Sequence, residues 1–426
     1  TCALPICDGQ GQVRAQQAPR PLSHRRGDLW ADCTVLGQFA GRHAQEPFLD
    51  SVGVGDDAAQ KIVRASLHIG DAVAEAAAGA ALRHRQRQPT LPQRLSKPPA
   101  QNTLGATAWE EAAIKTHFYI HGRIEGNLIR GNFCSGIWLD NVYQDVRITR
   151  NVILNNQGAG IFCEMGGGPC LIDNNVIALQ TPGNPEIGGN GIYTHDAGGV
   201  TAVHNLFCQN ARYGIFMQIV GERNYTVYPD DMASFAEPAI GEKPCHCSNI
   251  AIQNNVFVEN QRGALNLPYP AEKASNLSCN FNLYSDEGEA GLFAINDTAG
   301  ARQAEMLTAL PASFPALNLG KHLLLSYTGW KILMGMDSQS TTCNIHNVSW
   351  QILHPGPGTW LTYHIEPSGL VDCPVIPEVA CDFYGNPMPA SQPAPGPFQL
   401  VQQPGPYHFR LWPNEKAHAI IKSPSE

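Results

Sequence analysis

Two acidic side chains occupy equivalent positions in neighbouring copies of a short sequence motif. Each copy starts with Gly-Ile-aromatic, and the fourth residue after the glycine is Asp140 in one copy and Glu164 in the next. The following copy has His195 at this position, and His117 lies 23 residues before Asp140. If the copies are β-strands paired in parallel, the carboxyl groups lie about 5 Å apart, because paired strands are about 4.8 Å apart. Carboxyl pairs at that separation are typical of glycosidases that retain the configuration of the sugar.

The same stacking favours acid–base chemistry. Two like charges held this close repel each other, so the pKa of one carboxyl group should rise. A raised pKa is what a general acid needs, since the group must still carry its proton near the working pH. The pattern therefore predicts a catalytic pair rather than two independent surface acids.

These positions belong to an internal repeat that begins near residue 104. Asn followed by two apolar residues recurs along the chain, with the first three copies 24 residues apart. The copies begin at Asn127, Asn151, Asn175, Asn205, Asn255 and Asn282. A period near 24 with several β-rich runs and no helical unit predicts an all-β fold, a right-handed parallel β-helix. Asn at one repeated position predicts an internal ladder of side-chain amides between coils.

Strand alternation predicts which side chains point into this helix. The inward set is Ile137, Leu139, Ile161, Cys163, Ile192, Thr194, Ile215 and Met217. The outward set has an aromatic row, Trp138, Phe162, Tyr193 and Phe216. It also has a polar row, His117, Asp140, Glu164, His195 and Gln218. We therefore expect one outer face to carry aromatic rings beside the carboxyl pair, and Asp196 either to orient the His195 ring or to lie in a turn.

The repeat divides the chain into three parts. Residues 1–103 hold twelve of the 28 basic residues but only three of the 34 aromatics and show no strand period. We expect an irregular or non-native N-terminal segment there, the alternative being a disordered arm. Residues 104–300 should form the β-helix with its catalytic face. Residues 301–426 contain several Pro- and Gly-rich stretches and should form strands and loops that cover or flank the β-helix. Such a cover is expected because exposed coil ends present open strand edges.

Composition limits the function further. The net charge of −9 argues against a general nucleic-acid binder, which needs a basic surface to neutralise phosphates. The chain has no run of 18 apolar residues that could span a membrane, and its start lacks a signal-peptide pattern. Cys245-His246-Cys247 is spaced more tightly than a usual zinc knuckle, so we expect buried thiols and a loop. The predicted chemistry needs no cofactor or metal, and the sequence leaves oligomeric state and localisation open.

As a set, these motifs resemble glycoside hydrolase family 120, the β-helix β-xylosidases. The resemblance covers residues 108–290 and rests on Gly-Ile-Trp-Leu-Asp140, Arg147-Ile-Thr-Arg-Asn, Glu164 with the following Gly-Pro-Cys-Leu-Ile-Asp-Asn-Asn175, and Gly191-Ile-Tyr-Thr-His-Asp196. It implies that Asp140 is the nucleophile and Glu164 the acid/base. It also implies that Glu110, His117 and His195 contact the sugar. From the predicted aromatic row, we expect Trp138 to offer the sugar ring an apolar face.

The sequence departs from the family next to both acids. Asn141 follows the nucleophile position, where the family has an aromatic residue, and Gly166-Gly167 stands where the family has an Asn-His pair. Both positions border the expected sugar pocket. The flanking β-sandwich domain of the family also has no visible counterpart in this sequence.

The residues together predict a retaining glycoside hydrolase for β-xylosides or related pentosides, with an oligosaccharide or glycoside as its substrate. Two alternatives remain open. A polysaccharide lyase on the same fold would need cations around a uronate, and Lys115 is the only cation expected on this face. A non-catalytic carbohydrate-binding β-helix, such as an adhesin, would use the aromatic row but would not require the carboxyl pair.

Overall fold

The computed structural model describes residues 111–229, 239–285, 293–296, 308, 322–353, 358–366, 372–399, 401 and 405–412 in full. It describes the backbone alone at β1 (Ile6–Cys7), β2 (Val13–Arg14), β3 (Arg94–Leu95) and β25 (Ala316–Asn318). The expectations for residues 1–103 as a unit and for Glu110 therefore lie outside the described residues. The division of the chain into three parts, with its two boundaries, is not tested and stays a prediction.

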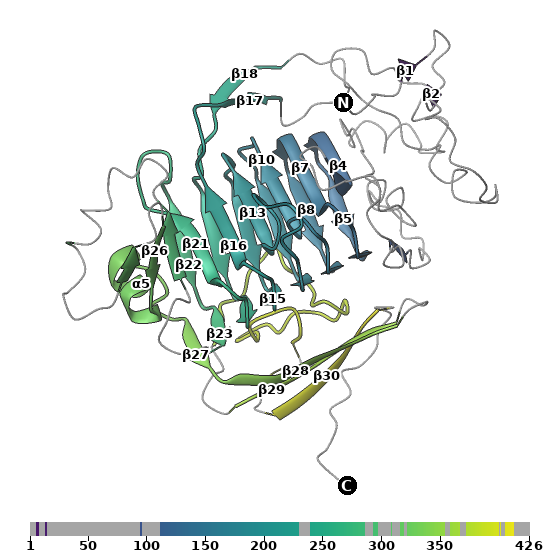
Figure 1. Cartoon of the computed structure of the whole chain (residues 1–426), viewed down its shortest axis with the longest axis vertical. Helices are drawn as coiled ribbons and strands as arrows, with labels where there is room; N and C mark the ends of the chain where they lie inside the picture. Colours follow the sequence, from purple (N-terminus) through teal and green to yellow (C-terminus); the bar gives the residue numbers. More distant parts are fainter. Residues whose placement is uncertain are drawn as a thin grey trace.

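The chain folds as a right-handed parallel β-helix, which confirms the predicted fold class. Its first sheet runs through β4 (Ala112–Ile120), β7 (Ser135–Gln144), β10 (Ile161–Glu164), β13 (Ile192–His195), β16 (Tyr213–Gln218), β21 (Gly263–Pro268) and β24 (Phe293–Asn296), and ends with β26 (His322–Leu325) and β25. The strands from β4 to β24 pair in parallel, whereas β26 and β25 add in antiparallel fashion. Figure 1 shows the coils stacked side by side from β4 toward α5.

Two further sheets complete each coil. The second sheet contains β5 (Arg123–Glu125), β8 (Val146–Thr149), β11 (Cys170–Asp173), β14 (Val200–Val203), β19 (Ile250–Gln253) and β22 (Leu277–Asn280). The third contains β3, β6 (Leu128–Arg130), β9 (Val152–Leu154), β12 (Val176–Ala178), β15 (Leu206–Cys208), β20 (Val256–Val258), β23 (Leu283–Ser285) and β27 (Thr341–Cys343). The pairing of β23 with β27 is parallel, so the repeat continues past the point where its sequence pattern fades.

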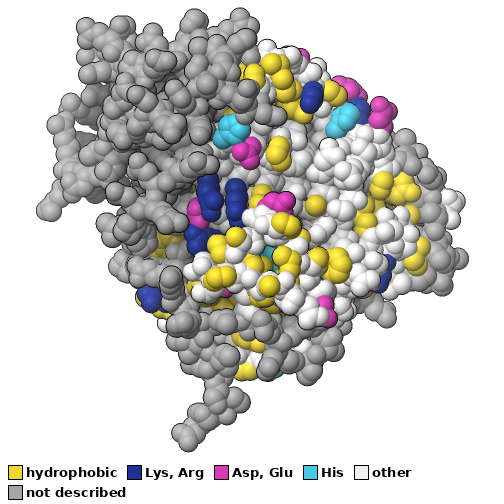
Figure 2. Space-filling model, turned by 180° about the vertical axis from the view of Figure 1, so that it is seen from behind, with side chains coloured by type: hydrophobic (Ala, Val, Ile, Leu, Met, Phe, Trp, Pro, Cys, Tyr) yellow, Lys and Arg dark blue, Asp and Glu magenta, His cyan; other side chains and the backbone are white. Residues whose placement is uncertain are grey.

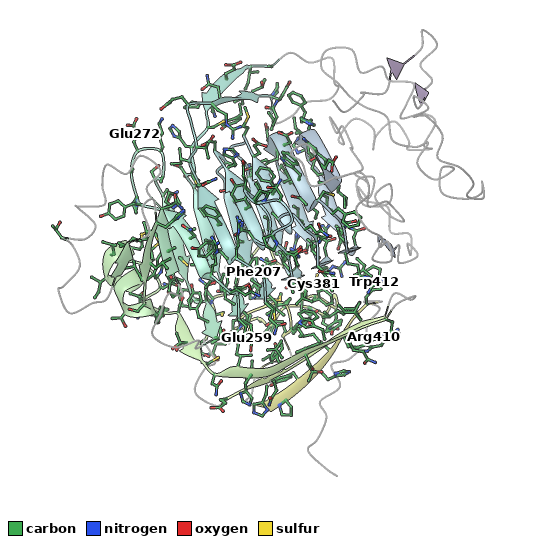
Figure 3. All side chains as sticks on the ribbon, in the orientation of Figure 1. Phe207, Glu259, Glu272, Cys381, Arg410 and Trp412 are labelled. Atoms are coloured by element: carbon green, nitrogen blue, oxygen red, sulfur yellow. The ribbon has the colours of Figure 1, made fainter. Side chains whose placement is uncertain are left out.

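The predicted inward side chains fill the interior of the coil. All eight are fully buried, and seven of them join the main apolar cluster. Aromatic rings stack along the same interior on the third sheet, where Phe207 lies 4.9 Å from Phe257 between ring centroids. Figure 3 shows Phe207 within the coil, whereas Trp412 lies on the flanking strand β30. Strand alternation therefore assigned the inner face correctly.

Two ladders of side-chain amides connect the coils. In the predicted ladder, each Asn donates its Nδ2 to the Oδ1 of the equivalent Asn in the next coil, at 2.9–3.1 Å from Asn127 through to Asn282. A second ladder, which we did not predict, lies five residues further along each coil. Its members are Asn132, Asn156, Gln180, Asn210 and Asn260. Both ladders satisfy buried backbone groups at corners where the sheet hydrogen bonds end.

A short helix covers the end of the β-helix. The helix α5 (Tyr327–Met334) begins after the N-cap Ser326 and ends at Gly335, which has the left-handed φ of 65°. Trp330 stacks on Phe293 of the last parallel strand, and its Nε1 donates to Asp337 at 2.7 Å. The predicted tail of strands and loops did not include this helix, because its eight residues give too short a periodic signal.

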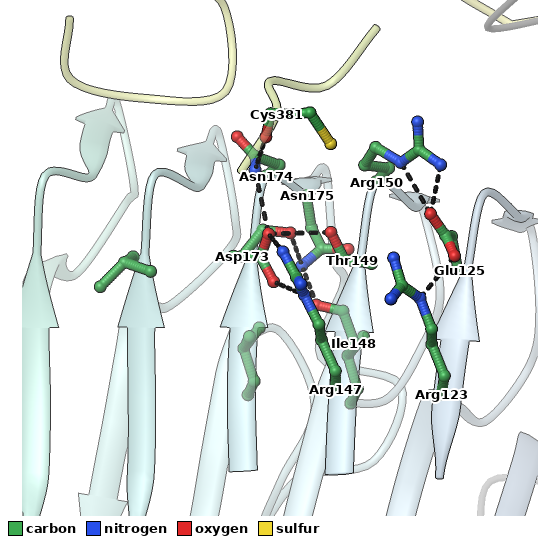
Figure 4. A network of polar contacts seen from close by, with 12 residues as sticks. Arg123, Glu125, Arg147, Ile148, Thr149, Arg150, Asp173, Asn174, Asn175 and Cys381 are labelled. Carbon is green, nitrogen blue, oxygen red and sulfur yellow. Dashed lines mark hydrogen bonds and ion pairs between the residues drawn. The ribbon is translucent and has the colours of Figure 1, made fainter. Parts of the chain in front are cut away.

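The C-terminal strands pack along the side of the β-helix. The antiparallel strands β28 (Ile345–Ile352), β29 (Thr359–Ile365) and β30 (Gly405–Trp412) share an apolar cluster with the outward side chains of the third sheet. Residues 372–399 run between them and the coils (Figure 1). On the second sheet, Arg147 binds Asp173 through two hydrogen bonds of 2.8 Å, while Asn174 donates to the carbonyl of Cys381 (Figure 4).

The described surface carries few charges for its size. Figure 2 shows the side opposite to Figure 1, where blue and magenta side chains meet near the centre among largely uncharged neighbours. This agrees with the 15% of charged residues in the sequence. In the described part of the chain, no helix has the length and apolar character that a membrane crossing requires.

Replacing one residue of the predicted Asn ladder should destabilise the whole helix. Asn175→Ala removes the acceptor for Asn151 and leaves the carbonyl of Ile148 without its 2.9 Å donor. Since buried polar groups without partners cost about 1–3 kcal/mol each, we expect the free energy of unfolding to fall by more than about 2 kcal/mol. Urea denaturation measures this loss. Asn344→Ala, at an exposed position between β27 and β28, is the control, and equal losses in both variants would contradict the ladder's role.

Candidate active site

The register of the first sheet assembles the predicted polar row. Asp140 of β7 pairs with Glu164 of β10, Glu164 pairs with His195 of β13, and Asp140 pairs with His117 of β4. Gln218 continues the row on β16. The Asp140 and Glu164 residues are only 7% and 8% exposed, so both acids lie largely out of water.

A left-handed corner follows four of the five members of this row, all except Gln218. The next residues are Phe118, Asn141, Met165 and Asp196, with φ between 47° and 53°. Such backbone costs about 1–2 kcal/mol in a residue other than glycine, and hydrogen bonds between coils offset it, such as that from the Met165 amide to the His195 carbonyl. The strands β10 and β13 end at their corners, whereas β4 and β7 continue to Ile120 and Gln144. The register still places the four polar side chains in one row across the sheet.

Asp140 is held by two nitrogen donors from β4. Its Oδ2 lies 2.9 Å from Lys115 Nζ and 3.1 Å from His117 Nε2. Lys115 is 1% exposed, and its ammonium lies 3.6 Å from the centre of the Trp138 ring. A charge-assisted hydrogen bond of this kind fixes the direction of the carboxylate.

Glu164 has a different electrostatic environment. Burial raises the pKa of Glu164, the Arg223 guanidinium opposes this by donating from Nη1 to Oε1 at 2.7 Å, and the charge of Asp140 raises the pKa further. The net direction is upward from the ordinary value of a glutamic acid. The two acids therefore differ in their partners, and Glu164 is the one that desolvation favours in its protonated form.

His195 is a neutral neighbour of Glu164. Burial lowers the pKa of His195 to about 4, with the charge of Arg223 acting in the same direction and Asp196 opposing it. Its Nδ1 lies 3.6 Å from Glu164 Oε1, which is longer than a hydrogen bond. A neutral imidazole can both donate and accept a hydrogen bond, which suits contact with a hydroxyl group.

The sequence did not reveal Arg223, and the expectation that Lys115 is the only cation on this face is wrong. Arg223 lies in the insertion before β17 (Asn224–Val227), which forms an antiparallel hairpin with β18 (Gly241–Pro244). The repeat assigns no position to inserted residues, so its pattern could not place Arg223 beside Glu164. The long gap between the repeats at residues 205 and 255 was the only signal.

Asp196 lies in a turn and contacts Arg223 rather than orienting the His195 ring. Its Oδ2 accepts from Arg223 Nε at 2.7 Å, while His195 Nε2 lies 3.8 Å away. Asp196 is completely buried, and its φ is 51°. Of the two expectations for this residue, the turn is the one that the structure shows.

The aromatic row does not present open ring faces, contrary to the expectation for Trp138. The exposed fractions are 1% for Trp138, 0% for Phe162, 1% for Tyr193 and 8% for Phe216. Trp138 stacks on Phe162 with 4.6 Å between ring centroids, and the Lys115 ammonium covers the ring as well. Rings at equivalent positions in adjacent coils are close enough to pack on one another. Their faces are therefore buried against neighbouring rings and are not exposed to a ligand.

Tyrosine rings fill the space beside Gly166-Gly167. A Cβ atom at Gly166 would overlap the ring of Tyr143, and one at Gly167 would overlap the hydroxyl of Tyr225. Tyr225 belongs to β17, so the hairpin packs where a family member would have larger side chains. The departure noted in the sequence is thus coupled to the insertion.

The cysteines near the hairpin are buried thiols. Burial raises the pKa of both Cys245 and Cys247 to about 12, so the two are protonated at neutral pH. Within the described ranges, no three His, Cys, Asp or Glu side chains are grouped so that they could hold a metal ion.

The match to a family model agrees with the fold of the chain. The family model described as right handed beta helix region matches residues 101–183. Among solved structures, the complex of XylC with xylose is similar at 14% identity and a TM-score of 0.47, covering 72% of this chain and 45% of that one. The chain thus spans less than half the length of XylC. No curated protein matches the chain.

The state of His195 can be tested directly. Because burial lowers its pKa to about 4, the ring should stay neutral between pH 5 and 8 and gain a proton only below that range. NMR of the ring Cε1–H signal, assigned with His195→Gln, measures the midpoint. In urea the midpoint should return to about 6.5. The unfolded chain then binds this proton more readily, so His195 should lower stability as pH falls from 6.5 toward 4; a folded midpoint near 6.5 would refute the assignment.

Proposed function

We propose that the protein is a retaining glycoside hydrolase that acts on β-xylosides or related pentosides. The observation that carries the proposal is the in-register pair of nearly buried acids, Asp140 and Glu164, each with its own cation. Equivalent residues of paired strands are about 4.8 Å apart, which suits the carboxyl separation of about 5–5.5 Å in retaining enzymes. The substrate class comes from the resemblance to glycoside hydrolase family 120.

Asp140 is the nucleophile in this proposal. Lys115 and His117 hold its Oδ2, which orients the carboxylate before the substrate binds. The carboxylate attacks the anomeric carbon, a bond forms between an Asp140 oxygen and that carbon, and the glycosidic C–O bond breaks. Once Glu164 has given up its proton, the Lys115 ammonium offsets part of the negative charge of the Glu164 carboxylate.

Glu164 is the acid and then the base. In the first step its proton passes to the leaving glycosidic oxygen, and the raised pKa of Glu164 keeps that proton available. In the second step the Glu164 carboxylate accepts a proton from water, whose oxygen attacks the anomeric carbon and releases Asp140. The sugar leaves with its original configuration because two inversions cancel.

The remaining predicted residues would contact the sugar. His117 and His195 flank the acids in the same row across the sheet and offer ring nitrogens to sugar hydroxyls. Glu110 stays a prediction. Trp138 would act through the position of Lys115 rather than through an open ring face, because its ring is covered.

A polysaccharide lyase is the second candidate, and Arg223 favours it more than the sequence did. Lys115 and Arg223 together supply two cations on this face, which a uronate substrate would require. Both cations are already bound to carboxylates, however, and this arrangement serves the hydrolase better. Release of unsaturated products from a uronate polymer would support the lyase, and sugar binding without any product would support a carbohydrate-binding protein.

Substitution of each acid should affect a different step. Asp140→Ala should abolish turnover of nitrophenyl xyloside, because no covalent intermediate can form. Glu164→Ala should slow hydrolysis by about 10²–10⁴-fold, the usual contribution of a general acid–base, and added azide should restore turnover as the glycosyl azide with retained configuration. Product stereochemistry is followed by NMR.

Trapping provides the independent check on the nucleophile. A 2-fluoro-xyloside with a good leaving group should label the wild-type chain at Asp140, as shown by peptide mass spectrometry. Gln218→Ala, at the next position of the row, is the control and should still be labelled. Labelling at another residue, or wild-type turnover by Asp140→Ala, would contradict the assignment.

A further inference from the structure

Arg223 connects the hairpin insertion to two acidic residues of the candidate site, Glu164 and Asp196. Its Nη1 donates to Glu164 Oε1 at 2.7 Å and its Nε donates to Asp196 Oδ2 at the same distance. Its Nη2 also lies 3.3 Å from the carbonyl oxygen of His195. One planar guanidinium thus binds three acceptors in fixed directions, which a lysine ammonium could not reproduce.

Asp196 fixes the point where the insertion leaves the coil. Its Oδ1 accepts from the backbone amide of Val220 at 2.6 Å and from that of Gly221 at 3.4 Å. Its own amide donates to the carbonyl of Gln218 in the sheet at 3.1 Å. A single buried carboxylate therefore anchors both the backbone and the arginine of the insertion.

The hairpin is also closed and docked next to the polar row. The Cys245 amide donates to the carbonyl of Arg223 at 2.7 Å, which joins the two ends of the insertion. Tyr225 packs on Gly167, and Tyr228 meets Phe118 edge to face at 5.8 Å. The hairpin that carries Arg223 is consequently held in place by hydrogen bonds and packing contacts with the β-helix.

We propose that Arg223 is a positioning residue for Glu164, and that Asp196 holds the guanidinium in place so that the hairpin sets the direction of the Glu164 carboxyl group. The catalytic part of this inference rests on the proposed hydrolase function. The positioning part rests only on the contacts of Arg223.

Several charged and titratable groups face Glu164. They are Lys115 on β4, Asp140 on β7, Tyr193 and His195 on β13, Asp196 at the following corner, Arg223 before β17 and Cys245 after β18. Burial and Asp140 raise the pKa of Glu164, while Arg223 and Lys115 lower it. Removing Arg223 leaves the raising effects less opposed, so Glu164 should hold its proton to higher pH. A smaller fraction of Glu164 is then ionised and able to accept a proton from water in the second step.

The first experiment titrates Glu164 without using activity. In a chain labelled with ¹³C at glutamate side chains, the Glu164 carboxyl signal is assigned with Glu164→Gln and followed against pH. We expect a higher midpoint in Arg223→Gln than in wild type. Arg262→Gln, the same change at an exposed arginine, is the matched control and should leave the midpoint unchanged. An unchanged midpoint in folded Arg223→Gln would overturn the proposal.

The second experiment tests whether Asp196 acts through Arg223. Asp196→Asn should shift the Glu164 midpoint in the same direction as Arg223→Gln, and the double variant should match Arg223→Gln alone. If the shifts of the two single variants add in the double variant, Asp196 acts on Glu164 independently of Arg223. That result would refute the proposal that Asp196 acts by holding Arg223. If Arg223→Gln does not fold, Arg223→Lys replaces it. Asp196→Asn should then have no effect on the Glu164 midpoint in the lysine variant, because a lysine lacks the guanidinium that joins Asp196 to Glu164.

Kinetics then connects the contact with catalysis. Arg223→Gln should lower kcat by about 10–100-fold, the scale of a misplaced catalytic group, with KM falling as well because the glycosyl-enzyme accumulates. The basic limb of the pH profile should move to higher pH. A loss in kcat with an unmoved basic limb would contradict positioning. A chain without glycosidase activity would end the hydrolase proposal but would leave the NMR titration valid.

Discussion

The pairing of equivalent residues between coils is the constraint on which the rest of this structure depends. Parallel strands lie about 4.8 Å apart, so whatever occupies a repeat position must tolerate a close copy of itself. Amides do this by donating and accepting in series, as along the ladder from Asn127 to Asn282. Aromatic rings do it by stacking, as Trp138 does on Phe162. Two carboxylates cannot, and they therefore need other groups to offset their repulsion.

The site can be understood as the solution to that repulsion. Asp140 and Glu164 are nearly buried neighbours of like charge, which would be costly without compensation. The β-helix supplies Lys115 to Asp140 from the preceding coil, and the hairpin supplies Arg223 to Glu164 from outside the repeat. The compensation is unequal, since burial still raises the pKa of Glu164 above its usual value. This inequality gives two similar side chains different electrostatic surroundings, as the proposed acid–base mechanism requires.

The sequence predicted the part of the site that the repeat controls. A period of 24 residues determines which residues pair, and strand alternation determines which point inward, so the row from His117 to His195 could be placed before the structure. Arg223 could not, because an insertion has no partner in the repeat and its path depends on tertiary contacts. The covering of Trp138 was missed for a related reason: alternation separates inside from outside, but burial of an outward ring depends on what packs on it.

The insertion and the glycines beside Glu164 are best explained together. Larger side chains at Gly166-Gly167 would overlap Tyr143 and Tyr225, so the hairpin can dock only because these positions lack a Cβ. Docking places Tyr225 against the corner and thereby brings Arg223, two residues earlier, within 2.7 Å of Glu164. The chain thus combines two glycines in one coil with a long connection between β16 and β19. The wall of the site next to Glu164 is consequently built by the hairpin, and under the proposed function the shape of that wall, more than the carboxyl pair, would decide which sugar fits.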